Sequence, residues 1–173
     1  MDYIHQYLSY LLTSTKTETE DYTYGERLVD PKAKIETEVD GKKMLQDMPL
    51  HCNQIEEVIN MYKTQGHGTN QAVMEIGMPS DLKLADPPCL RIIDTRIRYG
   101  KLHFFLYFRS WDLWGGFPSN LAGLELVKQH MAGEIGVGNG EIVAASKGLH
   151  IYEYAWELAK QRTHRSDLDI GKK

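Results

Sequence analysis

Residues 90–108 read LRIIDTRIRYGKLHFFLYF, and this stretch decides the fold. Its two halves are rich in β-branched and aromatic residues, and a short Tyr-Gly-Lys segment separates them. This pattern predicts an antiparallel β-hairpin with strands at 90–98 and 102–108. The run 104–108 is apolar at every position, so both faces of its strand must be covered. We therefore expect a second sheet against the outer face, packed there in a homodimer.

The other predicted elements follow from hydrophobic spacing and from residues typical of helix ends. The polar segment 13–47 is expected to form surface turns and edge structure, with one turn at Asp40-Gly41. The glycine-rich segment 136–140 is expected to be a loop. Strands and helices do not alternate regularly, so the sequence predicts an α+β fold with a mixed sheet and helices on one face. The predicted helices are 3–12, the segment between Asn53 and Gly66, the segment opened by Pro118, and 152–162; the remaining predicted strands are 71–77 and 141–149.

Length, charge and cysteine content limit the classes of function. A chain of 173 residues fits a single domain, 1–173. Its net charge of −4 provides no broad positive field for a nucleic acid. No apolar run approaches the ~20 residues of a membrane span, and the first twelve residues lack signal-peptide features. Cys52 and Cys89 form no disulfide framework, which favours a cytoplasmic protein with reduced thiols, and no metal-ligand spacing is present.

The densest group of polar and aromatic residues lies in 107–120, YFRSWDLWGGFPSN. It joins an apolar strand to a helix start and contains Arg109, Ser110, Asp112 and Asn120. An arginine, a hydroxyl and backbone N–H groups at a helix start suit a phosphate or another small anion. A carboxylate and an amide suit the polar edge of a heterocycle. The alternative is a connection whose polar groups satisfy one another.

Two further segments contain candidate functional residues. Cys89 follows Asp86 and two prolines, which give the chain a stiff lead into the thiol. Near an arginine this thiol could act as a nucleophile, whereas most cysteines are small buried hydrophobes. In KGLHIY, residues 147–152, His150 and Tyr152 share one face if the segment is a strand. They could bond a sugar hydroxyl, or they could be an ordinary half-buried pair.

Together these segments resemble the thymidylate synthase family. The family pattern is a proline-cysteine pair, an RSxDxxxGxPxN block and an HxY near the end of the core. Here PPC, RSWDLWGGFPSN and GLHIY occur in that order at fitting distances, within residues 20–160. The chain looks like a divergent, short branch of archaeal type. The resemblance implies reductive methylation of dUMP to dTMP by a homodimer, with methylene-tetrahydrofolate or methylene-tetrahydromethanopterin as the co-substrate.

The resemblance also implies roles for individual residues. Cys89 matches the nucleophile that adds to C6 of uracil, and Tyr24 matches a tyrosine used around removal of the C5 proton. Arg109 matches a phosphate-binding cation, and a cation near Cys89 would lower the pKa of the thiol. Ser110 matches a phosphate contact, and Asn120 matches the residue that reads the N3/O4 edge of uracil. His150 and Tyr152 match the pair that bonds the deoxyribose 3′-hydroxyl. Asp112 and Gly116 match pterin-binding positions.

Several family features have no match at the expected positions. A pair of arginines that subunits exchange to clamp the phosphate is replaced here by Thr69 and Asn70. An earlier segment with a flexible arginine and a catalytic glutamate has no counterpart before Tyr24. Because Met1 falls inside a predicted helix, we expect a fragment that lacks the N-terminal part of the family domain. Arginines that could restore the clamp are Arg27, Arg91, Arg96 and Arg98.

Two alternatives stay open at this stage. The same cysteine chemistry could yield a hydroxymethylated pyrimidine nucleotide, although a cytosine reader would carry an acid in place of Asn120. The chain could also be an inactive module that binds a nucleotide or only its partner subunit, since loss of a general acid–base group typically costs about 10²–10⁴-fold in rate. Product analysis tests the first alternative, and separate measurements of affinity and turnover test the second.

Overall fold

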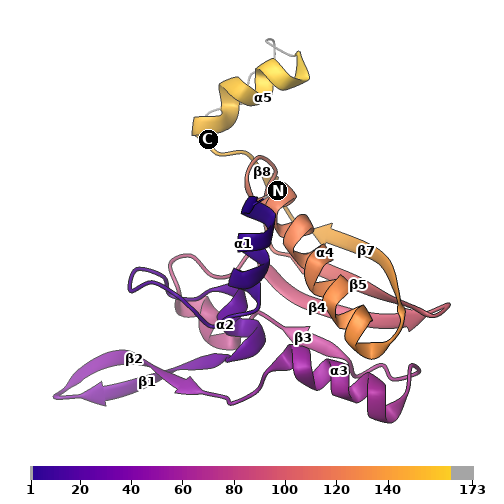
Figure 1. The fold of residues 1–173 in the computed structure, drawn as a ribbon. Helices are drawn as coiled ribbons and strands as arrows, with labels where there is room; N and C mark the ends of the chain where they lie inside the picture. The colour runs from indigo at the N-terminus through magenta and orange to yellow at the C-terminus, as the bar shows by residue number, and fades with distance from the viewer. Residues whose placement is uncertain (1, 165–173) are drawn as a thin grey trace.

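Helices packed on one face of a four-stranded sheet make up the body of the protein (Figure 1). The computed structural model describes residues 2–164. The sheet has the order β3-β4-β5-β7, with two antiparallel pairs and one parallel pair, which confirms a mixed α+β fold. The elements are α1 (Asp2–Leu11), α2 (Tyr24–Val29), β1 (Lys32–Val39), β2 (Lys42–Pro49), α3 (Gln54–Gln65), β3 (Val73–Glu75), η1 (Pro79–Lys83), β4 (Leu90–Arg98), β5 (Lys101–Phe108), β6 (Trp111–Asp112), α4 (Gly116–Ile135), β7 (Gly138–Ser146), β8 (Leu149–His150), η2 (Glu153–Ala155) and α5 (Trp156–Thr163).

The predicted hairpin is present as β4 and β5. Arg98 pairs with Lys101, which leaves Tyr99 and Gly100 as a two-residue turn. Both turn residues have positive φ angles, 51° and 70°, as a type I′ turn requires. This turn matches the right-handed twist of its strands, so it fixes the register that directs Phe104 and its alternate neighbours into the core.

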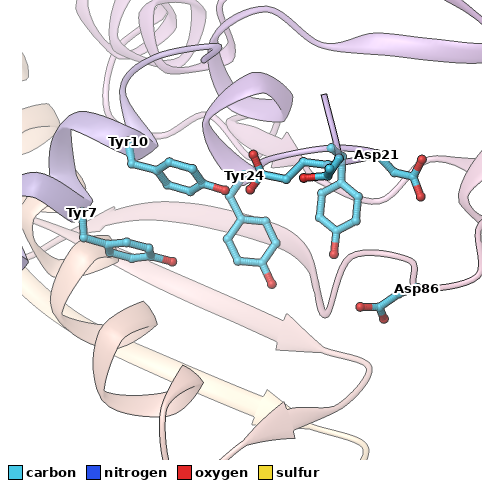
Figure 2. A pocket seen from close by; sticks show the side chains of 8 residues that line it. Tyr7, Tyr10, Asp21, Tyr24 and Asp86 are labelled. Atoms are coloured by element: carbon cyan, nitrogen blue, oxygen red, sulfur yellow. The ribbon is translucent and has the colours of Figure 1, made fainter. Parts of the chain in front are cut away.

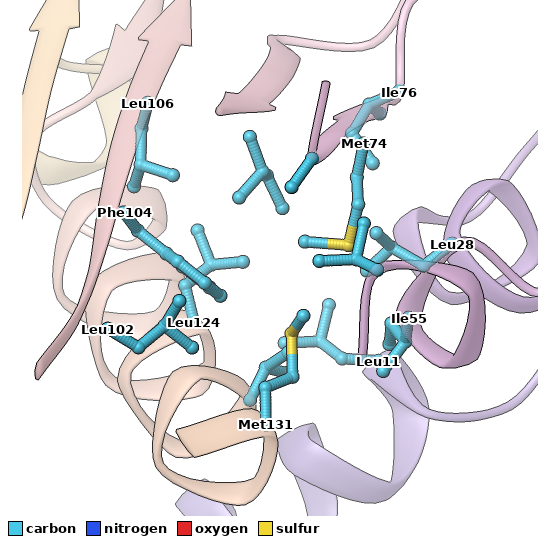
Figure 3. Packing of buried hydrophobic residues seen from close by; sticks show 14 of the residues in the cluster. Leu11, Leu28, Ile55, Met74, Ile76, Leu102, Phe104, Leu106, Leu124 and Met131 are labelled. Atoms are coloured by element: carbon cyan, nitrogen blue, oxygen red, sulfur yellow. The ribbon is translucent and has the colours of Figure 1, made fainter. Parts of the chain in front are cut away.

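The core lies between the inner face of the sheet and the helices α1, α3 and α4 (Figure 3). The helix after Asn53 is confirmed, because the Asn53 side chain accepts a hydrogen bond from the Glu56 N–H at 3.3 Å and caps α3. The predicted apolar face of α3 is buried, and so are Leu124, Val127 and Met131 of α4. The alternate side chains of β5 and the apolar faces of α3 and α4 therefore pack together in one continuous core.

The outer face of the same sheet stays largely exposed in the described part of the chain. Phe105 and Tyr107 of β5 are each 41% exposed, and Val143, which pairs with Phe105, is 50% exposed. A row of half-exposed aromatic and aliphatic side chains on a central strand is unusual for a free surface. The packing of this face in a homodimer stays a prediction.

Segment 13–47 is partly different from its prediction. The turn at Asp40-Gly41 is confirmed and joins β1 to β2, a separate two-stranded arm that projects from the body (Figure 1). The expectation of surface structure is wrong for α2, which is buried. Two of its buried residues are Glu26 and Arg27. Because charged residues usually indicate an exposed segment, the sequence pattern does not predict this burial. Both charges are compensated within the fold, Arg27 by a carboxylate at 2.7 Å.

The segments after α4 also differ from their predictions. The glycine-rich segment is not a loop throughout, because β7 begins at Gly138 and pairs in parallel with β5. A Cβ atom at Gly140 would collide with the Leu102 carbonyl, so the glycine permits close strand approach. The predicted helix 152–162 begins as the short turn η2 and continues as α5, which lies away from the body (Figure 1). No described helix is both long and apolar enough to span a bilayer.

Candidate functional site

Cys89 and Arg109 lie side by side where β4 begins and β5 ends. The Arg109 backbone N–H donates to the Cys89 carbonyl at 2.8 Å. The guanidinium folds back over the double proline, with Nε 3.1 Å from the Pro87 oxygen and 3.2 Å from the Pro88 oxygen. The guanidinium also forms an ion pair with Asp86, with Nη2 and Oδ1 2.9 Å apart. The stiff lead into Cys89 is therefore held in place by Arg109.

The pKa of the Cys89 thiol is not lowered, although a nearby arginine was expected to lower it. Its side chain is half-buried and forms no disulfide. Burial raises the pKa of the thiol, Arg109 lowers it as expected, and Asp86 raises it. The net result is a raised thiol pKa, because burial and Asp86 together outweigh the arginine.

Ser110 and His150 are brought together by the short parallel pair β6–β8. Ser110 Oγ lies 2.8 Å from His150 Nδ1, and either atom can donate depending on the imidazole tautomer. Tyr152 lies just beyond β8, so the two predicted partners do not share a strand face. Their rings nevertheless meet edge to face, with centroids 4.9 Å apart. The ring of Tyr152 thus belongs to the same cluster, although the residue is 54% exposed.

Asp112 closes the turn that leads into α4. One carboxylate oxygen accepts from the Trp114 N–H, and the other accepts from Gly115 and Gly116, each at 3.0 Å. Partial burial acts to raise the pKa of Asp112, but the three N–H donors outweigh it, and the pKa is lowered. A Cβ atom at Gly115 would lie 3.2 Å from the carboxylate. The glycine pair therefore lets the backbone wrap closely around Asp112.

The orientation of the Asn120 amide is fixed by Trp111. The indole Nε1 donates to Asn120 Oδ1 at 3.0 Å, and an indole N–H can only donate. The amide nitrogen must therefore point the other way, where it donates to the Tyr7 hydroxyl at 2.7 Å. Asn120 consequently presents a donor toward α1.

A tyrosine-lined pocket of about 550 Å³ adjoins these residues (Figure 2). Tyr7 and Tyr10 project into it from α1, and Asp86 reaches it from the loop before β4. Tyr24 connects the pocket to the cysteine, because its hydroxyl accepts from the Leu90 N–H at 3.1 Å. Burial raises the pKa of Tyr24, which keeps its hydroxyl protonated. Further lining residues are Thr19, Glu20, Asp21 and Tyr22.

Four arginines were candidates for the missing phosphate clamp. Arg27 and Arg91 instead share the buried carboxylate of Asp81, at 2.7 Å and 3.2 Å. Arg96 donates to the Thr69 carbonyl at 2.9 Å and lies next to the loop where the family has its arginine pair. Arg98 is exposed at the end of β4. Within the described residues, Arg109 is thus the arginine that the fold brings to Cys89.

Sequence reasoning missed the acidic and aromatic part of the site. Asp86 was noted only as a neighbour of the prolines, yet it pairs with Arg109. Tyr7 and Tyr22 also had no assigned role, although both line the pocket. The sequence signal was the tyrosine-rich composition of α1 and of the DYTY segment, residues 21–24. The described residues include no cluster of three or more His, Cys, Asp or Glu side chains suited to a metal ion.

The chain is similar to known proteins over most of its length. The sequence profile of the family described as thymidylate synthase matches residues 12–172. Two relatives named "Putative thymidylate synthase", from Methanosarcina barkeri and Methanosarcina acetivorans, are each 30% identical over 91% of this chain and 64% of their own length. A Listeria monocytogenes protein named thymidylate synthase is 30% identical over 69% of this chain and 38% of its own length.

These matches define the class of protein to which the α+β fold and the three motifs belong. The chain belongs to the thymidylate synthase family, as its three motifs indicate. It spans about 64% of the length of the Methanosarcina relatives that it matches.

Proposed function

We propose that this chain binds dUMP and methylates it reductively to dTMP through a covalent bond between Cys89 and C6 of the uracil ring. The observation that carries the proposal is the register that places Arg109 beside Cys89: their backbones are hydrogen-bonded at 2.8 Å, and the charge of the guanidinium favours the thiolate. It joins a nucleophile to a cation that suits a phosphate. A methylene-carrying tetrahydropterin, of the folate or the methanopterin type, supplies both the carbon and the reducing electrons.

The thiol and its neighbours divide the reaction into simpler steps. Attack of the Cys89 thiolate on C6 makes C5 a carbon nucleophile, which bonds to the methylene carbon of the co-substrate. Loss of the C5 proton and cleavage of the bond between that carbon and the pterin nitrogen leave a methylene group on C5. Hydride transfer from the tetrahydropterin, which becomes a dihydropterin, completes the methyl group as the cysteine departs. Tyr24 is the proposed hydroxyl near the C5 proton, and it stays protonated because its pKa is raised. Arg109 binds the phosphate and favours the thiolate. Ser110 is a further proposed phosphate contact.

Base recognition is assigned to Asn120. Its amide nitrogen faces away from the Trp111 indole and can donate to the O4 oxygen of uracil. Cytosine has an amino group at that position, so a donor there disfavours it. Substrate would replace the present contact of the amide nitrogen with the Tyr7 hydroxyl. The orientation of Asn120 therefore favours dUMP over the cytosine nucleotide that a hydroxymethylase would use.

The sugar and the pterin are assigned to the turns around α4 and β8. His150 is held by Ser110 at 2.8 Å, and Tyr152 packs against its ring, so both can bond the 3′-hydroxyl together. The ionised Asp112 fixes the backbone at Gly116 and offers a carboxylate to the N–H groups of a pterin ring. This arrangement keeps the acceptor charged at neutral pH, because the pKa of Asp112 is lowered.

Homodimerisation through the outer sheet face completes the proposal. The face carries half-exposed Phe105 and Tyr107, and Arg96 lies on it beside Thr69. We infer that Arg96 supplies the cross-subunit cation. Mixing inactive Cys89→Ser and Arg96→Gln variants should then restore part of the activity, because one site in the mixed dimer has both groups. A mixture that stays inactive excludes this role. The cytoplasmic location, and the lack of nucleic-acid and membrane partners, stay predictions.

The test of the main proposal is a covalent adduct. The full chain is incubated with 5-fluoro-dUMP and methylene-tetrahydrofolate or methylene-tetrahydromethanopterin, digested, and examined by mass spectrometry. We expect the mass increment on the peptide with Cys89 and none on the peptide with Cys52, which serves as an internal control. Cys89→Ser should abolish the adduct. Absence of any adduct on folded protein, while a known synthase reacts alongside, refutes nucleophilic catalysis.

The inactive-module alternative is tested separately. The dUMP affinity is measured by calorimetry and dTMP formation is measured by chromatography on the same preparation. Binding without product supports a nucleotide-binding module, whereas dTMP formation removes that alternative. A hydroxymethylated product would instead reverse the assignment of Asn120.

A further inference from the structure

The carboxylate of Asp86 already holds the guanidinium that the proposed function assigns to a phosphate. Its Oδ1 lies 2.9 Å from Arg109 Nη2. The other contacts of Nη2 and Nε go to the carbonyls of Pro87 and Pro88. One edge of the guanidinium is therefore occupied by the chain itself.

A carboxylate and a phosphate cannot share this edge of Arg109. Both anions bind a guanidinium through the same N–H donors. A phosphate beside an ionised carboxylate is also repelled by it. Asp86 is 87% exposed, so its side chain can turn away into solvent when another anion arrives. Arg109 is 33% exposed and stays fixed by the proline carbonyls.

We infer that Asp86 is an internal competitor for the anionic group of the substrate and so determines how strongly the site binds a phosphate. The inference rests on the proposed function, which places the nucleotide phosphate at Arg109. Asp86 holds the guanidinium against the double proline. In the bound site the phosphate takes the place of the carboxylate, and the affinity for dUMP reflects the difference between the two contacts.

The same carboxylate also faces the tyrosine pocket. Asp86 lines the tyrosine pocket directly. Its negative charge acts on Cys89, Tyr22 and Tyr152, and in each case it opposes loss of the proton. The effect on Cys89 gives a measurement that needs no nucleotide.

The test compares the ligand affinities of the wild-type chain and three variants. Asp86→Asn removes the competing charge and keeps the size of the side chain. We expect it to bind dUMP about two- to five-fold more tightly, as for an exposed ion pair, and to leave deoxyuridine affinity unchanged. Asp40→Asn at the tip of the β1–β2 arm controls for net charge. Asp21→Asn, a pocket carboxylate with no ion pair to Arg109 among the described residues, should have a smaller effect.

Two results would overturn the inference. One is an Asp86→Asn variant that binds dUMP no more tightly than the wild type, and the other is an equal gain in Asp21→Asn. If the wild type fails to bind dUMP, the proposed function fails, but inorganic phosphate still tests Asp86. Phosphate should then raise the Tm of Asp86→Asn more than that of the wild type, and the difference should vanish when Arg109→Gln is added. Equal shifts in Tm refute the inference.

The reactivity of the thiol provides the independent readout. The rate of Cys89 alkylation by iodoacetamide is measured against pH without any ligand. Asp86→Asn should shift the rate profile to lower pH, because it removes a charge that opposes ionisation of the thiol. An unchanged profile would show that Asp86 does not face the site.

Discussion

Substitution of Asp81 by alanine should strongly destabilise the protein. Asp81 and Arg27 are each only 1% exposed, and their charged atoms lie 2.7 Å apart. The second carboxylate oxygen of Asp81 lies 3.2 Å from Arg91 and accepts from the Met78 N–H at 2.7 Å. The substitution therefore leaves a buried guanidinium without its counter-charge and a backbone N–H without its acceptor.

The expected magnitude follows from these contacts. Breaking a buried ion pair on one side costs about 3–5 kcal/mol, and the lost backbone contact adds about 1 kcal/mol. The sum is a large share of a typical unfolding free energy of about 5–15 kcal/mol. Replacing both partners with apolar residues, as in Arg27→Met with Asp81→Leu, should recover most of the loss, because no fully buried charge is left uncompensated and the Arg91 side chain, 26% exposed, can be solvated.

The assay is urea unfolding followed by circular dichroism at one protein concentration. The double variant and an Asp40→Asn variant, which changes an exposed charge, serve as controls. Because η1 precedes the double proline and Arg91 follows Cys89, Asp81→Ala should also accelerate alkylation of Cys89 by loosening its surroundings. A change below about 1 kcal/mol for Asp81→Ala would refute the view that this carboxylate compensates a buried charge.

Three further outcomes are expected. The pKa of the Asp112 carboxylate is lowered in the folded state, so its stabilising effect is complete above its unfolded pKa of about 4 and is lost as the pH falls through the folded pKa. In Asp112→Asn the urea midpoint of unfolding should therefore depend less on pH over this acidic range than it does in the wild type. Tyr24→Phe leaves the buried Leu90 N–H without an acceptor and should lower the unfolding free energy by about 1–3 kcal/mol in the same assay. Phe105→Lys should convert a dimer to a monomer in sedimentation, and unchanged sedimentation would exclude the outer sheet face as the interface.

The parts of the fold set by local rules could be predicted from sequence. The β4–β5 hairpin follows from its two-residue turn, and α3 follows from its Asn53 cap and one apolar face. Parallel pairing of β7 with β5 was not predicted, because β7 begins inside the glycine-rich segment that was expected to be a loop. Burial of α2 was hidden for a different reason, since Arg27 finds its carboxylate partner, Asp81, far away in sequence.

In the candidate site, too, some features could be predicted from the sequence and others could not. The resemblance pointed to Cys89 and Arg109, and the fold brings them together. The net pKa of the thiol could not be predicted, because it depends on burial and on Asp86 as well as on the arginine. A sequence shows which charged residues are present. The pKa of a thiol, however, depends on how far burial and several neighbouring charges offset one another, and only the folded structure shows this.

The parallel β5–β7 pair has a consequence for the order of folding. The β4–β5 hairpin closes over two residues, whereas β7 reaches β5 only after α4 has formed and turned back. Closing such a long connection is slow, so docking of β7 is expected to be a late event on the folding pathway. Residues 109–116 lie on this connection, which means that the turn with Arg109, Ser110 and Asp112 reaches its final arrangement only when the last strand arrives. Pulsed hydrogen exchange should therefore protect the amides of β7 after those of the hairpin.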